Sequence, residues 1–205
     1  RVPDVAGGGR HGPGHRGQPG WYADPGSYRL LLGASASDIR ADAAYERVIG
    51  NDFVHLIRQP SNRGVSAARN TGISWCLEHG YEIVIMTDSD CLVPADFVRT
   101  HLELHRENPD VPVIGGSING VGATFWARLD QMMTWFHCIP GTPEGILQPS
   151  YTAPTANISV KIGALPFGDA FFDGYLRTGE DTAFSRKVRT AGYSILFSPR
   201  VEINH

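Results

Sequence analysis

Alternating runs of apolar and polar residues divide the chain into short strands and helices from about residue 27 onward. Short apolar runs bounded by glycine or polar residues are typical of buried strands, whereas apolar positions three and four residues apart indicate helices. We predict strands at 28–32, 53–57, 82–86, 111–114, 158–160, 194–197 and 201–203. We predict helices at 38–50, 65–78, 94–107, 124–136 and 180–190. This alternation predicts an α/β fold, a three-layer α/β/α sandwich with a mostly parallel central sheet.

The first 26 residues differ from the rest because they contain eight glycines and four prolines. Such a segment has too little apolar surface to offset the entropy lost on ordering, so we predict that it is disordered. A phosphate-binding glycine loop would need a strand before it and a helix after it, and neither pattern is present here. We therefore divide the chain into a disordered segment, 1–26, and one folded domain, 27–205.

Composition and charge narrow the class of protein. The 205 residues, 41% of them apolar, suffice for one domain with its own core. A formal net charge of -3 disfavours binding of nucleic acid through phosphate neutralisation, and we expect no nucleic-acid partner. No apolar run approaches the roughly 18 residues of a membrane-spanning helix. Three cysteines without a C-x-x-C pair are interpreted as free thiols, which predicts a reducing, cytoplasmic location.

The first candidate site is the segment Thr87-Asp88-Ser89-Asp90, which directly follows the strand predicted at 82–86. In open α/β sheets, ligands bind outside the carboxyl ends of the strands. Two carboxylates separated by one residue can hold Mg²⁺ or Mn²⁺ and connect the ion to the phosphates of a substrate. The alternative is a polar turn in front of the helix that begins near Pro94.

The second candidate site surrounds the start of the helix at 65–78. Gly64 supplies a tight turn after Asn62, and the helix N-terminus that follows suits an anion or the edge of a nucleotide. Arg69 and Asn70 then place polar groups early in an otherwise apolar helix. The alternative is a well-capped surface helix.

The third candidate site is Glu180-Asp181, with Arg186 later on the same helix and His205 at the end of the last strand. Carboxylates at a helix start are favoured by the helix dipole and can be plain caps. Either can also serve as a general base that deprotonates a hydroxyl. His205 is a candidate metal ligand.

Three further patterns admit two interpretations each. His101 and His105 have the spacing of metal ligands on a helix, but we favour a solvated helix face. The stretch at 125–136 is rich in aromatic residues and methionine, and we favour core packing over a surface that faces an acceptor or lipid. The loop at 140–154 is expected to be a mobile lid or disordered.

The order and spacing of these motifs resemble family 2 glycosyltransferases of the GT-A fold, over roughly residues 28–205. Ala156-Asn157-Ile158 and the segment 167–172 also resemble that family. The resemblance implies that the nucleotide-sugar donor is contacted by Asp88, Asp90, Asn62, Gly64, Arg69 and Asn70. It also implies that Asp181 is the catalytic base, with Glu180 in support or in that role. The metal site would consist of Asp88, Asp90 and His205. Arg186 would contact the diphosphate or brace the Glu-Asp segment.

The function implied is an inverting, metal-assisted transfer of a sugar from a UDP-, GDP- or dTDP-sugar to a hydroxyl of a saccharide, lipid-linked or protein acceptor. Mg²⁺ or Mn²⁺ is the expected cofactor. Family membership is also compatible with a longer parent chain that associates peripherally with a membrane, at its inner face. Two alternatives are a degenerate domain that binds without catalysis, and a nucleotidyltransferase that would release pyrophosphate.

The sequence departs from that family at both ends. No strand stands at the place of the family's first strand, which leaves a sheet edge exposed. Where the family has Asp-Asp-Gly-Ser-Thr-Asp, residues 32–38 retain only Asp38. The chain stops at His205, where the family continues into further helices. We therefore expect a fragment of a longer enzyme.

Overall fold

The computed structural model describes residues 30–34, 54–122, 124–176 and 178–205. Its strands are β1 (Leu30–Ala34), β2 (Val54–Arg58), β3 (Ile83–Thr87), β4 (Val113–Asn119), β5 (Gly145–Ile146), β6 (Asn157–Lys161) and β7 (Ile195–Asn204). Its helices are α2 (Val65–Glu78), α3 (Phe97–Glu107), α4 (Phe125–Trp135) and α5 (Glu180–Thr190), with a 3₁₀ turn, η1 (Ile162–Ala164). The segment expected to be disordered, 1–26, and the helix expected at 38–50 lie outside the described residues.

The main sheet has five strands in the order β3-β6-β4-β7-β5, and β1 pairs with β2 in a separate two-stranded sheet. In the main sheet only β4 and β7 form a parallel pair of neighbours, because β6 is antiparallel to both of its neighbours and β5 is antiparallel to β7. The prediction of a mostly parallel sheet was therefore wrong. Strand and helix alternation sets the order of elements along the chain, but it does not decide which strands become neighbours. Along the chain, α4 and β5 lie between β4 and β6, and β6 enters the sheet between β3 and β4 in the direction opposite to both.

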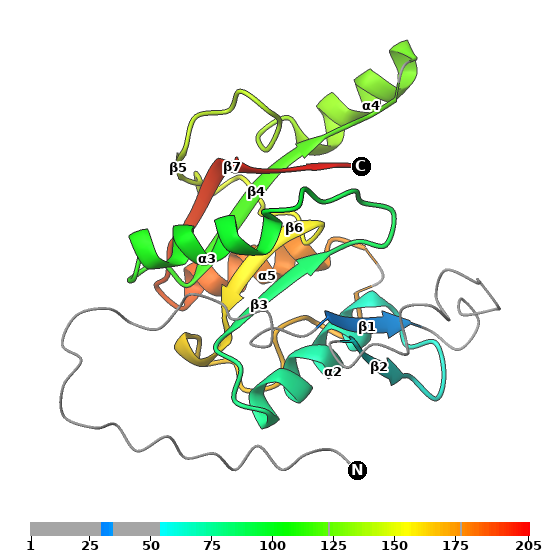
Figure 1. Ribbon diagram of the computed structural model, residues 1–205, viewed down its shortest axis with the longest axis vertical. Coiled ribbons are helices and arrows are strands. Elements are labelled where there is room, and N and C mark those ends of the chain that lie inside the picture. The colour runs from blue at the N-terminus through cyan, green and yellow to red at the C-terminus, as the bar shows by residue number, and fades with distance from the viewer. Residues whose placement is uncertain (1–29, 35–53, 123, 177) are drawn as a thin grey trace.

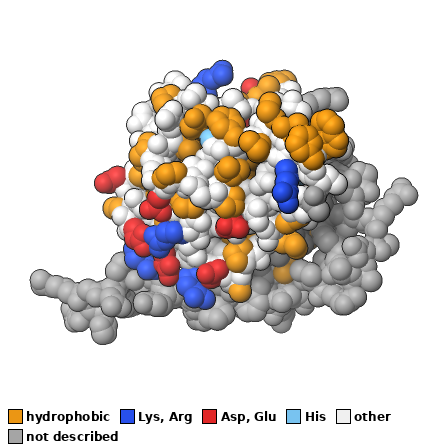
Figure 2. All heavy atoms as spheres, turned by 90° about the horizontal axis from the view of Figure 1, so that it is seen from above, with side chains coloured by type: hydrophobic (Ala, Val, Ile, Leu, Met, Phe, Trp, Pro, Cys, Tyr) orange, Lys and Arg blue, Asp and Glu red, His pale blue; other side chains and the backbone are white. Residues whose placement is uncertain are grey.

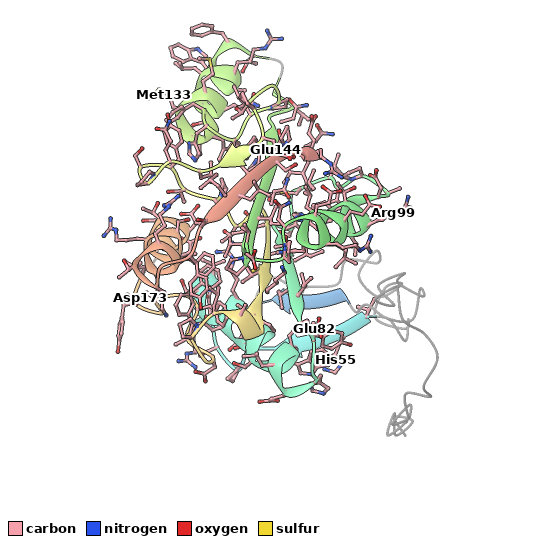
Figure 3. All side chains as sticks on the ribbon, turned by 90° about the vertical axis from the view of Figure 1, so that its left-hand side faces the viewer. His55, Glu82, Arg99, Met133, Glu144 and Asp173 are labelled. Carbon is pink, nitrogen blue, oxygen red and sulfur yellow. The ribbon has the colours of Figure 1, made fainter. Side chains whose placement is uncertain are left out.

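The helices cover both faces of the sheet, which confirms the predicted three-layer arrangement. Figures 1 and 3 show the main sheet between α3 on one side and α5 on the other. On the α5 side, Phe184 and Val188 pack with Ile73 of α2 in one core cluster. On the other side, Leu104 of α3 packs against Ile114 and other residues of β4 and β7.

Strand β3 lies at one end of the main sheet. Among the described strands it pairs only with β6, and its apolar residues are half-buried. The apolar run at 82–86, which in a sequence is typical of a strand buried in a parallel sheet, thus forms a half-buried strand with an antiparallel neighbour. A continuous apolar run is compatible with a terminal strand as well, because helices can cover both of its faces.

Strand β7 was predicted as two strands but is continuous. Pro199 and Arg200 look like a break in the sequence, and the pairing of β4 with β7 shifts at this point: Gly116 pairs with Ser198, whereas the next residue of β4 pairs with Glu202. The extra residues form a bulge, which accommodates a proline that cannot donate a backbone hydrogen bond. The strand then continues and brings His205 to the edge that holds Asp90.

Two helices present faces opposite to those expected. His101 and His105, predicted on a solvated face, are 0% and 3% exposed. Conversely, α4 has no buried residue, although its aromatic and methionine residues were expected in the core. Figure 2, which looks at the end of the molecule where α4 lies, shows hydrophobic side chains gathered on this face.

The loop at 140–154 is attached to the domain. Leu147 donates a backbone hydrogen bond to Ile195 O at 2.8 Å. The Arg189 guanidinium donates to the carbonyl oxygens of Gln148, Pro149 and Tyr151 at 2.5–3.2 Å. The loop is thus held against α5 in this structure. No helix in the described part of the chain is long and apolar enough to cross a membrane.

Candidate active site

The carboxylates Asp88 and Asp90 lie directly after β3, at the carboxyl end of that strand, as predicted. The chain turns there, because Cys91 N donates to Asp88 O at 3.2 Å. The Asp88 side chain is 39% exposed and that of Asp90 70% exposed. Both carboxylates are therefore accessible to a ligand at this edge of the sheet.

Arg69 joins the first and third candidate sites. Its guanidinium donates to Asp88 Oδ1 at 3.0 Å and to Glu180 Oε1 at 2.7 Å. The side chain is only 12% exposed, and the guanidinium lies 5.6 Å from the centre of the Phe172 ring. Hydrogen bonds between charged groups in such a shielded setting are stronger than neutral ones. Arg69 thus holds carboxylates from β3 and α5, which are far apart in sequence, in one place.

Asn70 fixes the segment that precedes α5. Its Nδ2 donates to Phe172 O at 2.8 Å, and its Oδ1 accepts from Phe172 N at 2.9 Å. This pair of bonds ties the segment 167–172 to α2, and with it the approach of the chain to Glu180. The sequence predicted a donor contact for Asn70, and the structure shows that its side-chain amide is engaged within the protein.

The turn before α2 is built by Asn62 and Gly64. Asn62 Oδ1 accepts a hydrogen bond from Gly64 N at 2.9 Å, and Gly64 has a φ of 85°. Glycine adopts this left-handed conformation without the clash that a Cβ would cause. Both residues are exposed, and the helix start beside them is open to a ligand.

Asp181 is a half-buried carboxylate in the first turn of α5. Burial raises its pKa above the ordinary value for aspartate, and the hydrogen bond from Thr182 N to Asp181 Oδ1, at 2.7 Å, acts in the opposite direction. The neighbouring Glu180 adds repulsion that also raises the pKa. A carboxylate with a raised pKa accepts a proton more readily, which suits a general base.

His205 lies beside Asp90, as the sequence predicted for a shared metal site. His205 Nε2 is 3.6 Å from Asp90 Oδ1, and its ring meets Trp135 edge-on at 4.6 Å between centroids. The backbone of His205 is held by bonds with Asn119 O, at 2.9 Å, and Val121 N, at 3.1 Å. Trp135 was not identified from the sequence, because nothing in the helical pattern indicates that it meets the last residue of the chain.

The cluster of groups that could hold a metal contains Cys91 in addition to Asp90 and His205 of the expected set. Ligand atoms of Asp90, Cys91 and His205 all lie within 4.8 Å of one another. Asp88 instead directs Oδ1 at Arg69. Carboxylate, thiol and imidazole groups at this spacing fit a divalent cation. Cys91 was missed as a site residue because only the folded structure brings its neighbour His205 to it.

Arg186 does not join this cluster. It follows Asp181 by five residues, which places it roughly 140° around the helix. It is exposed and lines a surface hollow with Thr152 and Thr182. No hydrogen bond or ion pair links it to Asp88, Asp90 or Glu180 among the described residues.

Solved structures share this fold at low sequence identity. A crystal structure of GalNAc-T7 with UDP, GalNAc and Mn²⁺ aligns over 86% of this chain, with a TM-score of 0.57 and 14% identity. The mannosyltransferase PcManGT from Pyrobaculum calidifontis, in complex with GDP-Man and Mn²⁺, aligns over 79%, with a TM-score of 0.52 and 17% identity. The chain spans only 37% and 42% of those two proteins. The fold is that of the GT-A glycosyltransferases.

The family is shown by the sequence itself. The profile of glycosyl transferase family 2 matches residues 33–164, which is more than half of the chain. The chain belongs to glycosyltransferase family 2. The sequence matches no curated protein.

Proposed function

We propose that this domain transfers a sugar from a nucleoside diphosphate sugar to an acceptor hydroxyl, with a divalent cation and with inversion at the anomeric carbon. The observation that carries the proposal is the Arg69 bridge between Asp88 and Glu180. It places the carboxyl end of β3 and the start of α5 on one edge, where Asp90 and His205 also meet. Family membership and the Mn²⁺ and nucleotide ligands named for the two similar structures support it.

On the donor side, Asp90 and His205 would hold a divalent cation, with Asp88 beside them. When bound, such a cation supplies positive charge that stabilises the leaving diphosphate. The open N-terminus of α2, after Gly64, offers unpaired backbone N–H groups to a phosphate or base edge. Arg69 is occupied by two carboxylates, so its role is to position them. The nucleotide is uridine, guanosine or thymidine diphosphate.

On the acceptor side, Asp181 takes the proton of the attacking hydroxyl. Thr182 N occupies one carboxylate oxygen, Oδ1, which leaves Oδ2 for the acceptor. The acceptor oxygen forms a bond with the anomeric carbon while the bond to the diphosphate oxygen breaks and its electron pair leaves with the diphosphate. A single displacement of this kind inverts the anomeric centre. The acceptor is a saccharide, a lipid-linked sugar or a protein.

Calorimetry with Mn²⁺ and a panel of nucleotide sugars tests the donor site. We expect binding that requires the metal and that disappears in Asp90→Ala. Asp110→Asn, an exposed carboxylate in another loop, is the matched control and should bind as the wild type does. Binding that is unaffected by Asp90→Ala would contradict the donor site.

Turnover tests the base. Asp181→Asn should lower the rate by about 10²–10⁴-fold while nucleotide-sugar binding persists, because only proton transfer is removed. Since the base acts when ionised, the wild-type rate should rise with pH through the raised pKa of Asp181. Metal-dependent binding without any turnover in the wild type would favour a domain that binds but does not catalyse. Release of pyrophosphate from a nucleoside triphosphate would favour a nucleotidyltransferase.

A further inference from the structure

Cys91 lies beside Asp90 and His205, two of the three residues that the family resemblance implies as metal ligands. The ligand atoms of Asp90, Cys91 and His205 lie within 4.8 Å of one another. Cys91 is half-buried, and Asp90 and His205 approach it from two different segments of the chain. A single divalent cation can therefore contact a carboxylate oxygen, a sulfur and an imidazole nitrogen at this point.

The backbone around Cys91 is held in place on both sides. Before it, Cys91 N donates to Asp88 O at 3.2 Å. After it, Leu92 and Asn204 exchange two backbone hydrogen bonds, at 2.8 and 3.0 Å. This antiparallel bridge clamps the Asp90-Cys91 turn to the end of β7, directly beside His205. The three ligand groups thus come from backbone positions that are fixed relative to one another.

The identity of the three donor groups determines which metal suits them. Mg²⁺ and Mn²⁺ favour oxygen ligands, whereas a thiolate with an imidazole and a carboxylate is typical of Zn²⁺. Three protein ligands leave one tetrahedral position open for water or a phosphate oxygen. Asp88, which would add a second oxygen ligand, is engaged with Arg69 at 3.0 Å.

We propose that Cys91 is the third protein ligand of this site, with Asp90 and His205, and that it shifts the site's preference from Mn²⁺ toward Zn²⁺ and Co²⁺. The inference rests on the proposed function only in taking the cluster of Asp90, Cys91 and His205 as the metal site. Nitrogen and oxygen sites in general bind Zn²⁺ more tightly than Mn²⁺, so a bare preference for Zn²⁺ is uninformative. The informative quantity is the part of the preference that depends on the sulfur of Cys91.

Optical titration of the whole chain with Co²⁺ gives a direct readout without turnover. A Co²⁺ ion bound by Cys91 should show a sulfur-to-metal charge-transfer band in the near ultraviolet. Cys91→Ser should abolish the band, whereas the wild type and Asp110→Asn should retain it. Cys76 and Cys138 are buried, and neither belongs to a cluster of metal-ligating groups among the described residues, so they are poor competitors for the metal. The absence of a Cys91-dependent band would overturn the proposal.

Competition between metals provides the second measurement. Cys91→Ser should weaken Zn²⁺ binding by at least about tenfold and change Mn²⁺ binding far less, because loss of even a supporting group costs that much in metal sites. His205→Gln should weaken both metals. Equal losses of Zn²⁺ and Mn²⁺ affinity in Cys91→Ser would contradict the proposal.

The two proposals fail in different ways. Mn²⁺-dependent nucleotide binding that survives unchanged in Cys91→Ser, with no Cys91-dependent band, would retain the donor site and overturn the role of Cys91. A Cys91-dependent Co²⁺ band in a chain that binds no nucleotide sugar would retain the metal site and overturn the donor function. Circular dichroism of each variant verifies that the domain remains folded.

Discussion

Helices α3 and α4 are both 11 residues long, and each carries an apolar stripe along one face. In α3 that face is buried and includes Phe97, His101, Leu104 and His105. In α4 no residue is buried, and Trp126 and Met133 are each 74% exposed. Two similar patterns thus have opposite environments in one domain. A helical period defines a face, but it does not say what the face meets.

The main sheet explains the burial of α3. This helix crosses β6, which presents polar side chains at the positions where the histidines arrive. His101 Nε2 lies 3.1 Å from Asn157 Oδ1, and His105 Nε2 lies 2.8 Å from Ser159 Oγ. A buried polar group that has a partner avoids most of the cost of leaving water. For one ring nitrogen of each histidine, β6 therefore supplies a partner more than fifty residues away in sequence, whereas Nδ1 of both is buried without a partner among the described residues.

Helix α4 projects beyond the sheet. Figure 1 shows it at one end of the molecule, beyond the sheet, and Met133, labelled in Figure 3, lies on this helix. Its start is capped locally, because Ala127 N donates to Thr124 Oγ1 at 3.1 Å. Its inner side reaches the sheet only through half-buried residues such as Gln131 and Trp135. The apolar stripe faces away from the core.

The comparison is tested most strongly by the same substitution in each helix. Leu104→Ala, in α3, removes a fully buried side chain and should lower the free energy of unfolding by about 2–5 kcal/mol. Leu129→Ala, in α4, removes a side chain at the exposed face and should cost less than about 1 kcal/mol. Urea denaturation measures both. Equal losses would mean that α4 is packed as tightly as α3.

The buried histidines should make stability depend on pH. Burial lowers the pKa of His101 to about 4, against an ordinary value of 6.5. Burial, with repulsion from Lys161 and His101, lowers the pKa of His105 to about 3. Below about pH 6.5, the two histidines bind protons in the unfolded chain but remain neutral in the folded chain. Stability is therefore complete above that pH and declines as pH drops toward 4, by about 3 kcal/mol for His101.

His101→Gln should flatten that pH dependence, because it removes one of the two groups responsible. His79→Gln, at an exposed histidine directly after α2, is the matched control and should retain the wild-type dependence. The measurement is the free energy of unfolding in urea at several values of pH between 4 and 7. A wild-type slope in His101→Gln would show that His101 does not contribute.

The smallest effects are expected on the exposed face of α4. Trp126→Ser and Met133→Ser should each change the free energy of unfolding by no more than about 0.5 kcal/mol, because neither side chain leaves water on folding. Thermal unfolding monitored by circular dichroism is sufficient to detect a larger change. A loss of 2 kcal/mol or more would contradict the exposure of this face.

In the candidate site, as in the two helices, the sequence predicted local features but not the contacts between distant segments. The sequence placed Asp88 and Asp90 after a strand, Asp181 at a helix start and His205 at the end of the last strand, because these are local features. It could not show that Arg69 bridges Asp88 to Glu180, or that Asn70 binds the backbone of Phe172, because both contacts join residues distant in sequence. Cys91 was overlooked for the same reason.

The sequence by itself determined most of the helices and strands that the structure describes, and the order of the motifs. Helices 65–78 and 180–190 were predicted with the bounds observed, because apolar period and glycine positions are encoded within each segment. The three-layer arrangement followed from strand and helix alternation. Only the tertiary structure decided the direction of the sheet's strands, the burial of α3, the exposure of α4 and the partners of Arg69. Each of these depends on which segments become neighbours, and that outcome is set by packing over the whole domain.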